Sequence, residues 1–170
     1  MASLMEELLL TMDGETEQYR KLIDLNGSKK DSIIHQKLDV LEAVTIEEQL
    51  IADSLVELSK KRVTLLRNMA QVLGKDGEEI TVSWMIDNLA SQPVEQQQLK
   101  KAKEELVQAA DNMQVLNFQT QNLLKQAVEM VDFDLQLLRS AKQAPQTSNY
   151  GRDAYTTGEI LGNSGFDAKQ

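Results

Sequence analysis

The sequence predicts an all-α protein: an elongated antiparallel three-helix bundle with coiled-coil character, a short connecting helix and a flexible C-terminal tail. Aromatic residues make up only 4% of the chain, whereas Leu, Glu, Gln, Lys and Ala are abundant, as in long packed helices. Apolar residues recur at helical spacing before and after Pro93. The only prolines are Pro93 and Pro145, and each should mark a boundary because proline disrupts a helix interior.

With 170 residues, the chain is long enough for one core but too short for two independent ones. We expect residues 1–144 to form the helical bundle domain and residues 145–170 to form the flexible tail, because helical periodicity ends at Pro145. The tail is rich in polar residues and glycine, so it buries too little to fold alone. Its apolar residues are expected to be isolated anchors: Tyr150, Tyr155, Ile160, Leu161 and Phe166.

The first helix is expected to begin near Ser3, where Glu6 completes a capping-box pattern. Gly14 weakens its middle, and Asn26-Gly27-Ser28 predicts its end in a turn. Its apolar face comprises Leu4, Leu8, Met12, Tyr19, Leu22 and Ile23.

The second helix is expected to start at Asp31 or Ser32 and to run to Leu73, with Gly74 placed to stop it. Such a helix would be about 60 Å long at ~1.5 Å per residue. Its apolar stripe therefore requires a comparably long antiparallel partner. The stripe comprises Ile34, Leu38, Leu41, Val44, Ile51, Leu55, Leu58, Leu65, Met69 and Val72.

A short helix is expected between Ile80 and Leu89, with Trp84 and Met85 packed over one end of the bundle. The alternative for Trp84 is a binding anchor. The third long helix should open after Pro93, which suits a first helical turn. Its seven-residue apolar repeat predicts a left-handed, coiled-coil-like seam. From Leu123 onward the apolar arc widens, which predicts two neighbouring helices; the added residues are Leu124, Val128, Val131, Leu135 and Leu138.

The residues do not indicate catalysis. His35 is the only histidine and cysteine is absent, so one chain cannot supply a histidine-based triad, a multi-histidine metal site or a zinc–thiolate site. A glycine-rich phosphate loop is also missing. We therefore expect no enzyme activity, no catalytic residue, no cofactor and no metal.

Charge and the N-terminal residues limit the partners and the compartment. The net charge of −9 is spread along the chain without a basic stripe, which disfavours nucleic acid and an anionic membrane surface. The stretch MASLMEELLL has no Lys or Arg before its apolar residues, and two glutamates interrupt it. It is expected to be neither a signal peptide nor a membrane anchor, so the cytoplasm is the expected compartment.

Polar residues close to the apolar stripes are candidates for specific contacts. Glu48 and Arg62 lie about 21 Å apart on one helix at ~1.5 Å per residue. Each therefore needs a partner on a neighbouring helix or exposure at the edge of the seam. On the third helix Asn117 and Asn122 flank the stripe, where they either fix the helix register or contact a ligand.

One apolar group does not fit the predicted core. Val115, Phe118 and Phe133 lie on the side of the third helix roughly opposite its main seam. The first helix or the connection buries them, or they line a groove for a partner helix.

The stretch NFQTQNLLKQAVEMVDFDLQLL, Asn117–Leu138, closely resembles the signature of FlgN-type flagellar export chaperones. The shared features are two asparagines five residues apart, a Leu-Leu pair and an apolar run ending in Leu-Leu. Leu4 through Leu25, with Tyr19 and Leu22 in place, approximates the family's opening pattern. The acid and arginine of the second helix, the Tyr-Gly pair after the last helix and the closing FDAKQ agree as well.

The resemblance implies a cytoplasmic chaperone of flagellar type III export. Such proteins bind the amphipathic C-terminal segments of the hook-associated, or hook–filament junction, proteins FlgK and FlgL. They prevent premature assembly and deliver these proteins to the export gate. The gate-docking Tyr-Gly element corresponds to Tyr150 and Gly151, while a further family glycine is Ala154 here. The partner-binding candidates are Val115, Asn117, Phe118, Asn122, Phe133, Tyr150 and Gly151.

Two alternatives stay open at this stage. One is a chaperone or adaptor of another secretion system, with the same bundle and tail but a different cargo. The other is a structural coiled-coil protein that self-associates along its seam, as a homodimer. Glu48, Thr120 and Asp134 interrupt the apolar stripes, which argues against a long symmetric coiled coil.

Overall fold

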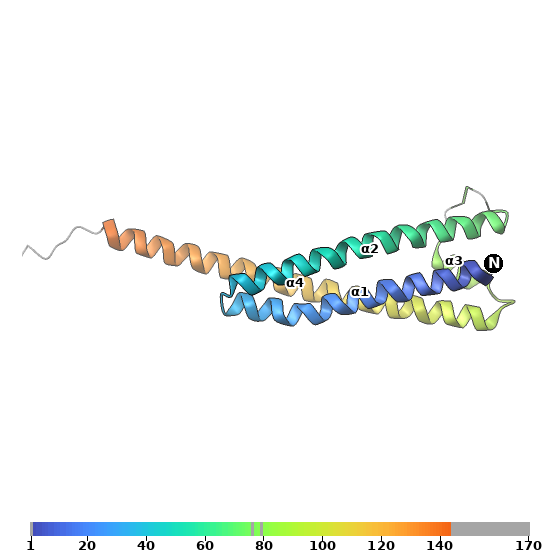
Figure 1. The fold of residues 1–170 in the computed structure, drawn as a ribbon, viewed down its shortest axis with the longest axis horizontal. Coiled ribbons are helices and arrows are strands. Elements are labelled where there is room, and N and C mark those ends of the chain that lie inside the picture. The colour runs from blue at the N-terminus through green and yellow to red at the C-terminus, as the bar shows by residue number, and fades with distance from the viewer. Residues whose placement is uncertain (1, 76, 79, 144–170) are drawn as a thin grey trace, which may run out of the picture. The chain divides into compact units, whose positions relative to one another are not determined.

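The computed structural model describes residues 2–75, 77–78 and 80–143, and none of them lies in a strand. Its helices are α1 (Ala2–Ile34), α2 (Leu38–Val72), α3 (Val82–Asn88) and α4 (Pro93–Gln143) (Figure 1). The all-α prediction is therefore confirmed. The chain divides into two compact units, Met1–Val128 and Glu129–Gln170. Within the second unit, residues 129–143 are described.

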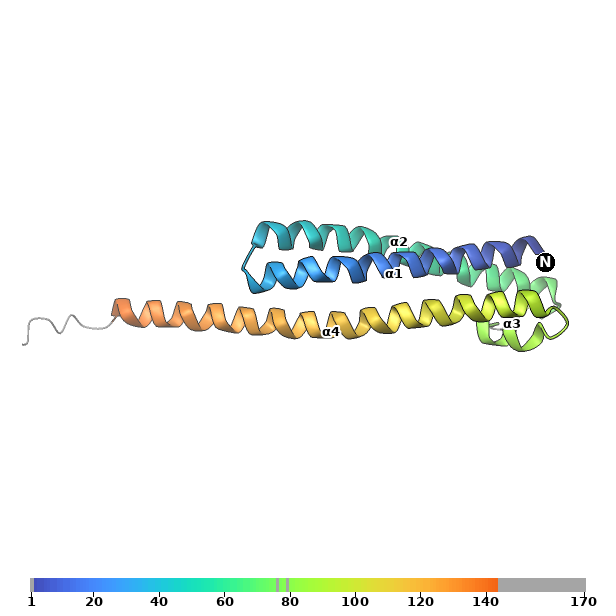
Figure 2. The same ribbon diagram turned by 90° about the horizontal axis from the view of Figure 1, so that it is seen from below.

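In the first unit, α1 and α2 form an antiparallel hairpin, and α4 runs beside them in the direction of α1 (Figures 1 and 2). The expectation that the long second helix needs a long antiparallel partner is thus confirmed, and α1 is that partner. The main cluster of buried hydrophobic side chains lies near α3, where side chains of all four helices meet. It includes Met5, Leu8, Met12, Leu65, Met69, Met85, Leu89, Leu99 and Ala102.

The predicted turn at Asn26-Gly27-Ser28 is wrong, because α1 continues through these residues to Ile34. A glycine in a helix interior costs about 1 kcal/mol relative to alanine, a penalty that tertiary packing of a long helix overrides. Asn26 is buried rather than in a turn, as is Ser32 in the last turn of α1. The predicted start of the second helix at Asp31 or Ser32 is therefore also wrong.

The turn between α1 and α2 centres on Gln36, which has a left-handed backbone (φ 54°). The Lys37 amide donates to the Ser32 carbonyl at 2.9 Å, and the Gln36 amide donates to the Ile33 carbonyl at 3.3 Å. This pair of bonds is a Schellman motif, which usually carries glycine at the left-handed position. The same motif closes α2 at Gly74 (φ 70°), so the predicted stop at that glycine is confirmed.

The short helix is confirmed at α3, where the Thr81 hydroxyl accepts a hydrogen bond from the Trp84 amide at 3.1 Å. Met85 is buried, and Trp84 is partly buried against the core cluster. The packing interpretation of Trp84 is thus the correct one. Following α3, α4 begins at Pro93, as predicted.

The seam of α4 is buried at Leu99, Ala102, Ala109 and Thr120, which confirms its predicted course through the first unit. The expectation that the widened arc after Leu123 packs against two neighbours is wrong. All five added residues are exposed: Leu124, Val128, Val131, Leu135 and Leu138. The arc is therefore a surface of the protein and not part of its core.

Candidate partner-binding surface

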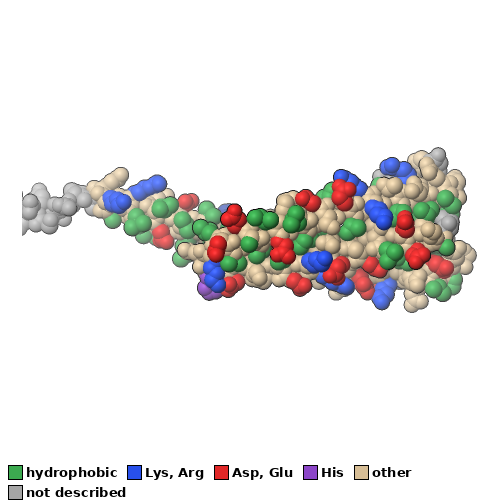
Figure 3. All heavy atoms as spheres, in the orientation of Figure 1, with side chains coloured by type: hydrophobic (Ala, Val, Ile, Leu, Met, Phe, Trp, Pro, Cys, Tyr) green, Lys and Arg blue, Asp and Glu red, His purple; other side chains and the backbone are tan. Residues whose placement is uncertain are grey.

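The most unusual surface is the last part of α4, residues 129–143, which we call the α4 C-terminal segment. Every residue in it is exposed, and Figure 3 shows hydrophobic side chains along its visible face beside Lys and Arg. The acidic residues fall in its first half and the basic residues in its second half. Its large exposed apolar residues are Met130, Val131, Phe133, Leu135, Leu137 and Leu138.

Two of these side chains continue the repeat that α4 buries in the first unit. Met130 and Leu137 stand in the same seven-residue phase as the buried Ala102 and Ala109, yet they are 65% and 54% exposed. A helix that presents a seam of this kind to solvent is suited to pack against another helix. Contiguous apolar surface on a monomer commonly marks an interaction site.

The off-seam residues predicted from the sequence are also exposed. Val115, Phe118 and Phe133 are 57%, 65% and 58% exposed, so burial by the first helix or by the connection is wrong for all three. Asn117 and Asn122 are exposed too. A register-fixing role for these two asparagines is therefore wrong, because neither amide lies in the buried seam.

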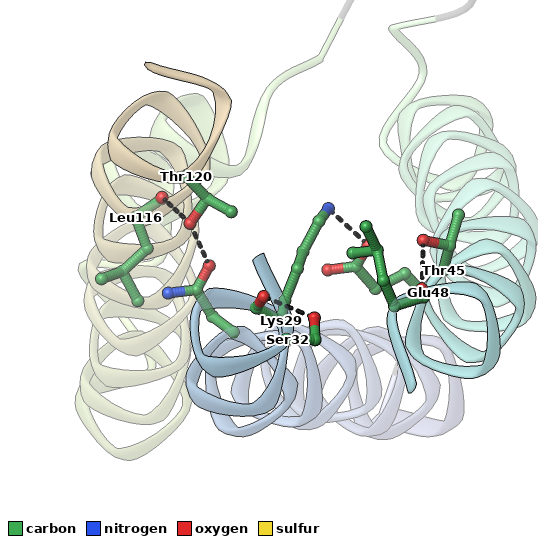
Figure 4. Close-up of polar contacts among 8 residues, drawn as sticks. Lys29, Ser32, Thr45, Glu48, Leu116 and Thr120 are labelled. Atoms are coloured by element: carbon green, nitrogen blue, oxygen red, sulfur yellow. Dashed lines mark hydrogen bonds and ion pairs between the residues drawn. The ribbon is translucent and has the colours of Figure 1, made fainter. Parts of the chain in front are cut away.

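The buried polar contact between α1 and α4 lies at Thr120 instead. Its hydroxyl donates to the Asn26 side-chain oxygen at 2.7 Å and lies 2.9 Å from the Leu116 carbonyl (Figure 4). Thr120 and Asn26 are both buried, so this bond holds one relative position of the two helices. The sequence indicates this contact only through a threonine in the apolar seam, because it predicts a turn at Asn26.

The two charged residues singled out on α2 each have a partner on α1. Lys29 donates to Glu48 at 2.7 Å, and Figure 4 shows the two side chains pointing toward one another. Arg62 Nε donates to Glu15 Oε2 at 2.8 Å. The expectation of partners on a neighbouring helix is thus confirmed, and the two bonds neutralise charge along the hairpin interface.

A third ionic cluster lies at the turn between α1 and α2. The pKa of the Asp31 carboxyl is lowered, chiefly because Lys37 donates a hydrogen bond to it and secondarily because of the Lys37 and His35 charges. The Lys37–Asp31 distance is 3.2 Å. All three side chains are exposed, so the cluster contributes modestly to the turn.

Between α2 and α4 the first unit is hollowed into a groove floored by α1, which we call the α2–α4 groove. It consists of two cavities of ≈ 650 and ≈ 530 Å³ that share Tyr19 and Ala110 in their linings. The larger one also reaches Val82 and Ser83 in α3. Its lining combines apolar side chains such as Val63 and Leu106 with charged ones such as Arg62, a mixture that can receive one face of an amphipathic helix.

The remaining predicted site residues, Tyr150, Gly151, Tyr155, Ile160, Leu161 and Phe166, lie outside the described residues. Among residues 2–75, 77–78 and 80–143, no group of three or more His, Cys, Asp or Glu side chains is arranged to hold a metal ion. Within the same ranges, every helix is too short or too polar to span a bilayer.

Comparison with protein families gave one finding: the model of a family described as FlgN protein matches residues 1–158. This range includes all of the described helices and the Tyr-Gly pair at residues 150–151. Comparison with curated proteins gave no match, and comparison with solved structures gave none either.

Proposed function

Because the chain belongs to the FlgN family, whose members are chaperones of flagellar type III export, we propose that it binds the hook–filament junction proteins FlgK and FlgL. Binding takes place in the cytoplasm, prevents premature assembly of these proteins and precedes their delivery to the export gate. The observation that carries this proposal is the α4 C-terminal segment, whose apolar side chains are exposed although they follow a packing repeat.

The physical basis is helix-on-helix packing. An amphipathic terminal segment of the cargo covers Met130, Leu137 and their neighbours, and its own apolar face is withdrawn from other cargo subunits. The cargo segment becomes ordered only on binding. The entropic cost of that ordering keeps the affinity moderate and allows release at the export apparatus.

Exposed residues of α4 within the first unit are proposed as further partner contacts. Phe118 and Val115 supply apolar area, and Asn117 and Asn122 supply amides that donate and accept hydrogen bonds. Aromatic side chains of this kind commonly act as anchors in protein interfaces.

Docking at the export gate is proposed for Tyr150 and Gly151, with Tyr155, Ile160, Leu161 and Phe166 as further tail anchors. The Tyr150→Ala variant separates the two roles. It should bind cargo like the wild type and reduce cargo export from cells. Loss of the purified complex in this variant would instead place Tyr150 in the cargo site.

Co-purification with the C-terminal segments of FlgK and FlgL tests the chaperone proposal. The wild type should form a complex, and the Met130→Gln, Leu137→Gln double variant should lose most of it. The matched control is the Ile46→Gln, Leu50→Gln double variant of α2, which changes side chains of similar exposure (59% and 65%). The proposal fails if neither segment is retained, and the site assignment fails if both double variants bind equally.

A further inference from the structure

We propose that the α2–α4 groove holds the cargo as a fourth helix whose carboxyl end lies beside Arg67 and Lys103. This inference rests on the proposed chaperone function. It adds the α2–α4 groove as a contact surface of its own and gives a direction for the bound segment.

The groove has the form of a helical bundle that lacks one member. Its floor is α1, represented by Tyr19, and its walls carry Val63 from α2 and Leu106 from α4. Val63 and Val107 are each about half exposed (49% and 47%). One amphipathic helix would cover both walls at once, whereas a flat partner would reach only the rims.

Two acidic side chains that line the groove, Glu15 and Glu48, each form an ion pair within the chain. Glu15 is bonded to Arg62, and Glu48 is bonded to Lys29. An incoming apolar stripe therefore meets no isolated buried charge, which would otherwise oppose binding. This arrangement favours a cargo helix with an uncharged stripe over a strongly charged segment.

The remaining charges differ between the two cavities. The cavity next to α3 is lined by Arg67, Lys103 and Glu78, and Glu78 is bonded to Lys75 at 3.3 Å. The other cavity is lined by Asp111. A helix carries partial negative charge at its carboxyl end and partial positive charge at its amino end. Its carboxyl end therefore fits beside Arg67 and Lys103.

Helix directions in the first unit agree with this orientation. Both α1 and α4 run away from α3, while α2 runs toward it. A cargo helix that ends near α3 gives two helices in each direction, so the helix dipoles oppose one another. A free carboxylate at the end of the cargo adds to the attraction by the two basic side chains.

Paramagnetic labelling tests the position and the direction. The chain contains no cysteine, so Val63→Cys and Gln49→Cys can each carry a single nitroxide, about 21 Å apart along α2 at ~1.5 Å per residue. With an isotopically labelled FlgK C-terminal peptide, the label at position 63 should broaden its last residues and the label at position 49 its earlier ones. If the label at position 63 instead broadens the earlier residues of the peptide and the label at position 49 its last ones, the proposed direction of the cargo helix is wrong.

If the peptide binds and neither label broadens it, the groove proposal fails while the chaperone function stands. If full-length FlgK and FlgL do not bind at all, both fail. A control without peptide uses the isotopically labelled chain: broadening of residues 144–170 by the nitroxide on their own chain, or of any residue by a nitroxide on a second copy, would mean that the groove is already occupied and is not a cargo site.

Substitutions provide an independent readout. Ala110→Trp should fill the groove and weaken peptide binding by about ten-fold or more, while the exposed Ala43→Trp on α2 should not. Arg67→Gln with Lys103→Gln should weaken binding by about two- to five-fold and remove the preference for a free carboxylate over an amidated peptide. Lys21→Gln with Lys61→Gln is the charge-matched control. The proposal is wrong if the Arg67→Gln, Lys103→Gln variant binds the peptide as tightly as the Lys21→Gln, Lys61→Gln control.

Discussion

Across the interface of α1 and α2, Arg62 Nε donates a hydrogen bond to Glu15 Oε2 at 2.8 Å, and the two side chains differ sharply in exposure. The Glu15 side chain is 4% exposed and the Arg62 side chain 28%. The carboxylate thus depends on its partner for solvation, whereas the guanidinium also reaches water. Removing the Arg62 guanidinium should therefore destabilise the protein more than neutralising the Glu15 carboxylate.

Arg62→Met should destabilise the protein by about 3 kcal/mol or more, because it leaves a buried carboxylate without its partner. Glu15→Gln should cost only about 1 kcal/mol, since the amide oxygen can still accept from Arg62. Urea unfolding followed by circular dichroism gives both values. Equal losses, or a larger loss for Glu15→Gln, would contradict the assigned asymmetry.

Thr120→Val should cost about 1–3 kcal/mol, because the buried Asn26 oxygen loses its hydrogen-bond donor. Thr120→Ser keeps the hydroxyl and should lose only the contribution of one methyl group, about 1 kcal/mol. Asn117→Ala and Asn122→Ala should each change the free energy of unfolding by less than about 0.5 kcal/mol, because both side chains are exposed. A valine variant as stable as the wild type would refute the role of this bond.

Gln36→Gly should stabilise the α1–α2 turn by up to about 1 kcal/mol, because glycine adopts the left-handed backbone without a Cβ clash. Gln36→Ala retains the Cβ and should give no such gain. Thermal unfolding of the two variants compares them directly. A lower melting temperature for the glycine variant would show that the Gln36 side chain contributes more than its backbone costs.

Asp31 predicts a pH dependence. Its carboxyl pKa lies below the ordinary 3.8, chiefly because of the hydrogen bond from Lys37. A depressed carboxyl pKa stabilises the folded state above the unfolded-state pKa, and this contribution is lost as the pH falls through the folded-state pKa. The stability advantage of the wild type over Asp31→Asn should therefore shrink as the pH falls from about 5 to below about 3. A difference independent of pH would refute this linkage.

The helices were predictable because their signals are local. Pro93, Gly74 and the repeat through Leu99 and Ala109 fix where α4 begins, where α2 ends and which face is buried. The α1–α2 turn was not predictable, since its left-handed position holds Gln36 instead of glycine. Composition alone does not show that a residue as ordinary as glutamine adopts this backbone.

Within the α4 C-terminal segment, only Phe133 is a partner-binding candidate from the sequence, whereas Met130 and Leu137 follow the seam repeat, which predicts burial, and are exposed. Phe118 and Phe133 stood out by their position relative to the seam, yet Leu135 and Leu138 were assigned to the core. An apolar stripe that packs inside the chain and one that receives a partner have the same spacing. Similarly, Glu48 and Arg62 indicated a need for partners, but Lys29 and Glu15 lie far away in sequence.

Amide hydrogen exchange in the complex with the FlgK C-terminal segment tests the central claim most directly. In the free protein, the amides of residues 129–143 should exchange rapidly at the exposed helix end. On cargo binding their exchange should slow markedly, and the Met130→Gln, Leu137→Gln variant should lose this protection. A stable complex in which exchange in residues 129–143 is unchanged would contradict the claim that this segment binds the cargo.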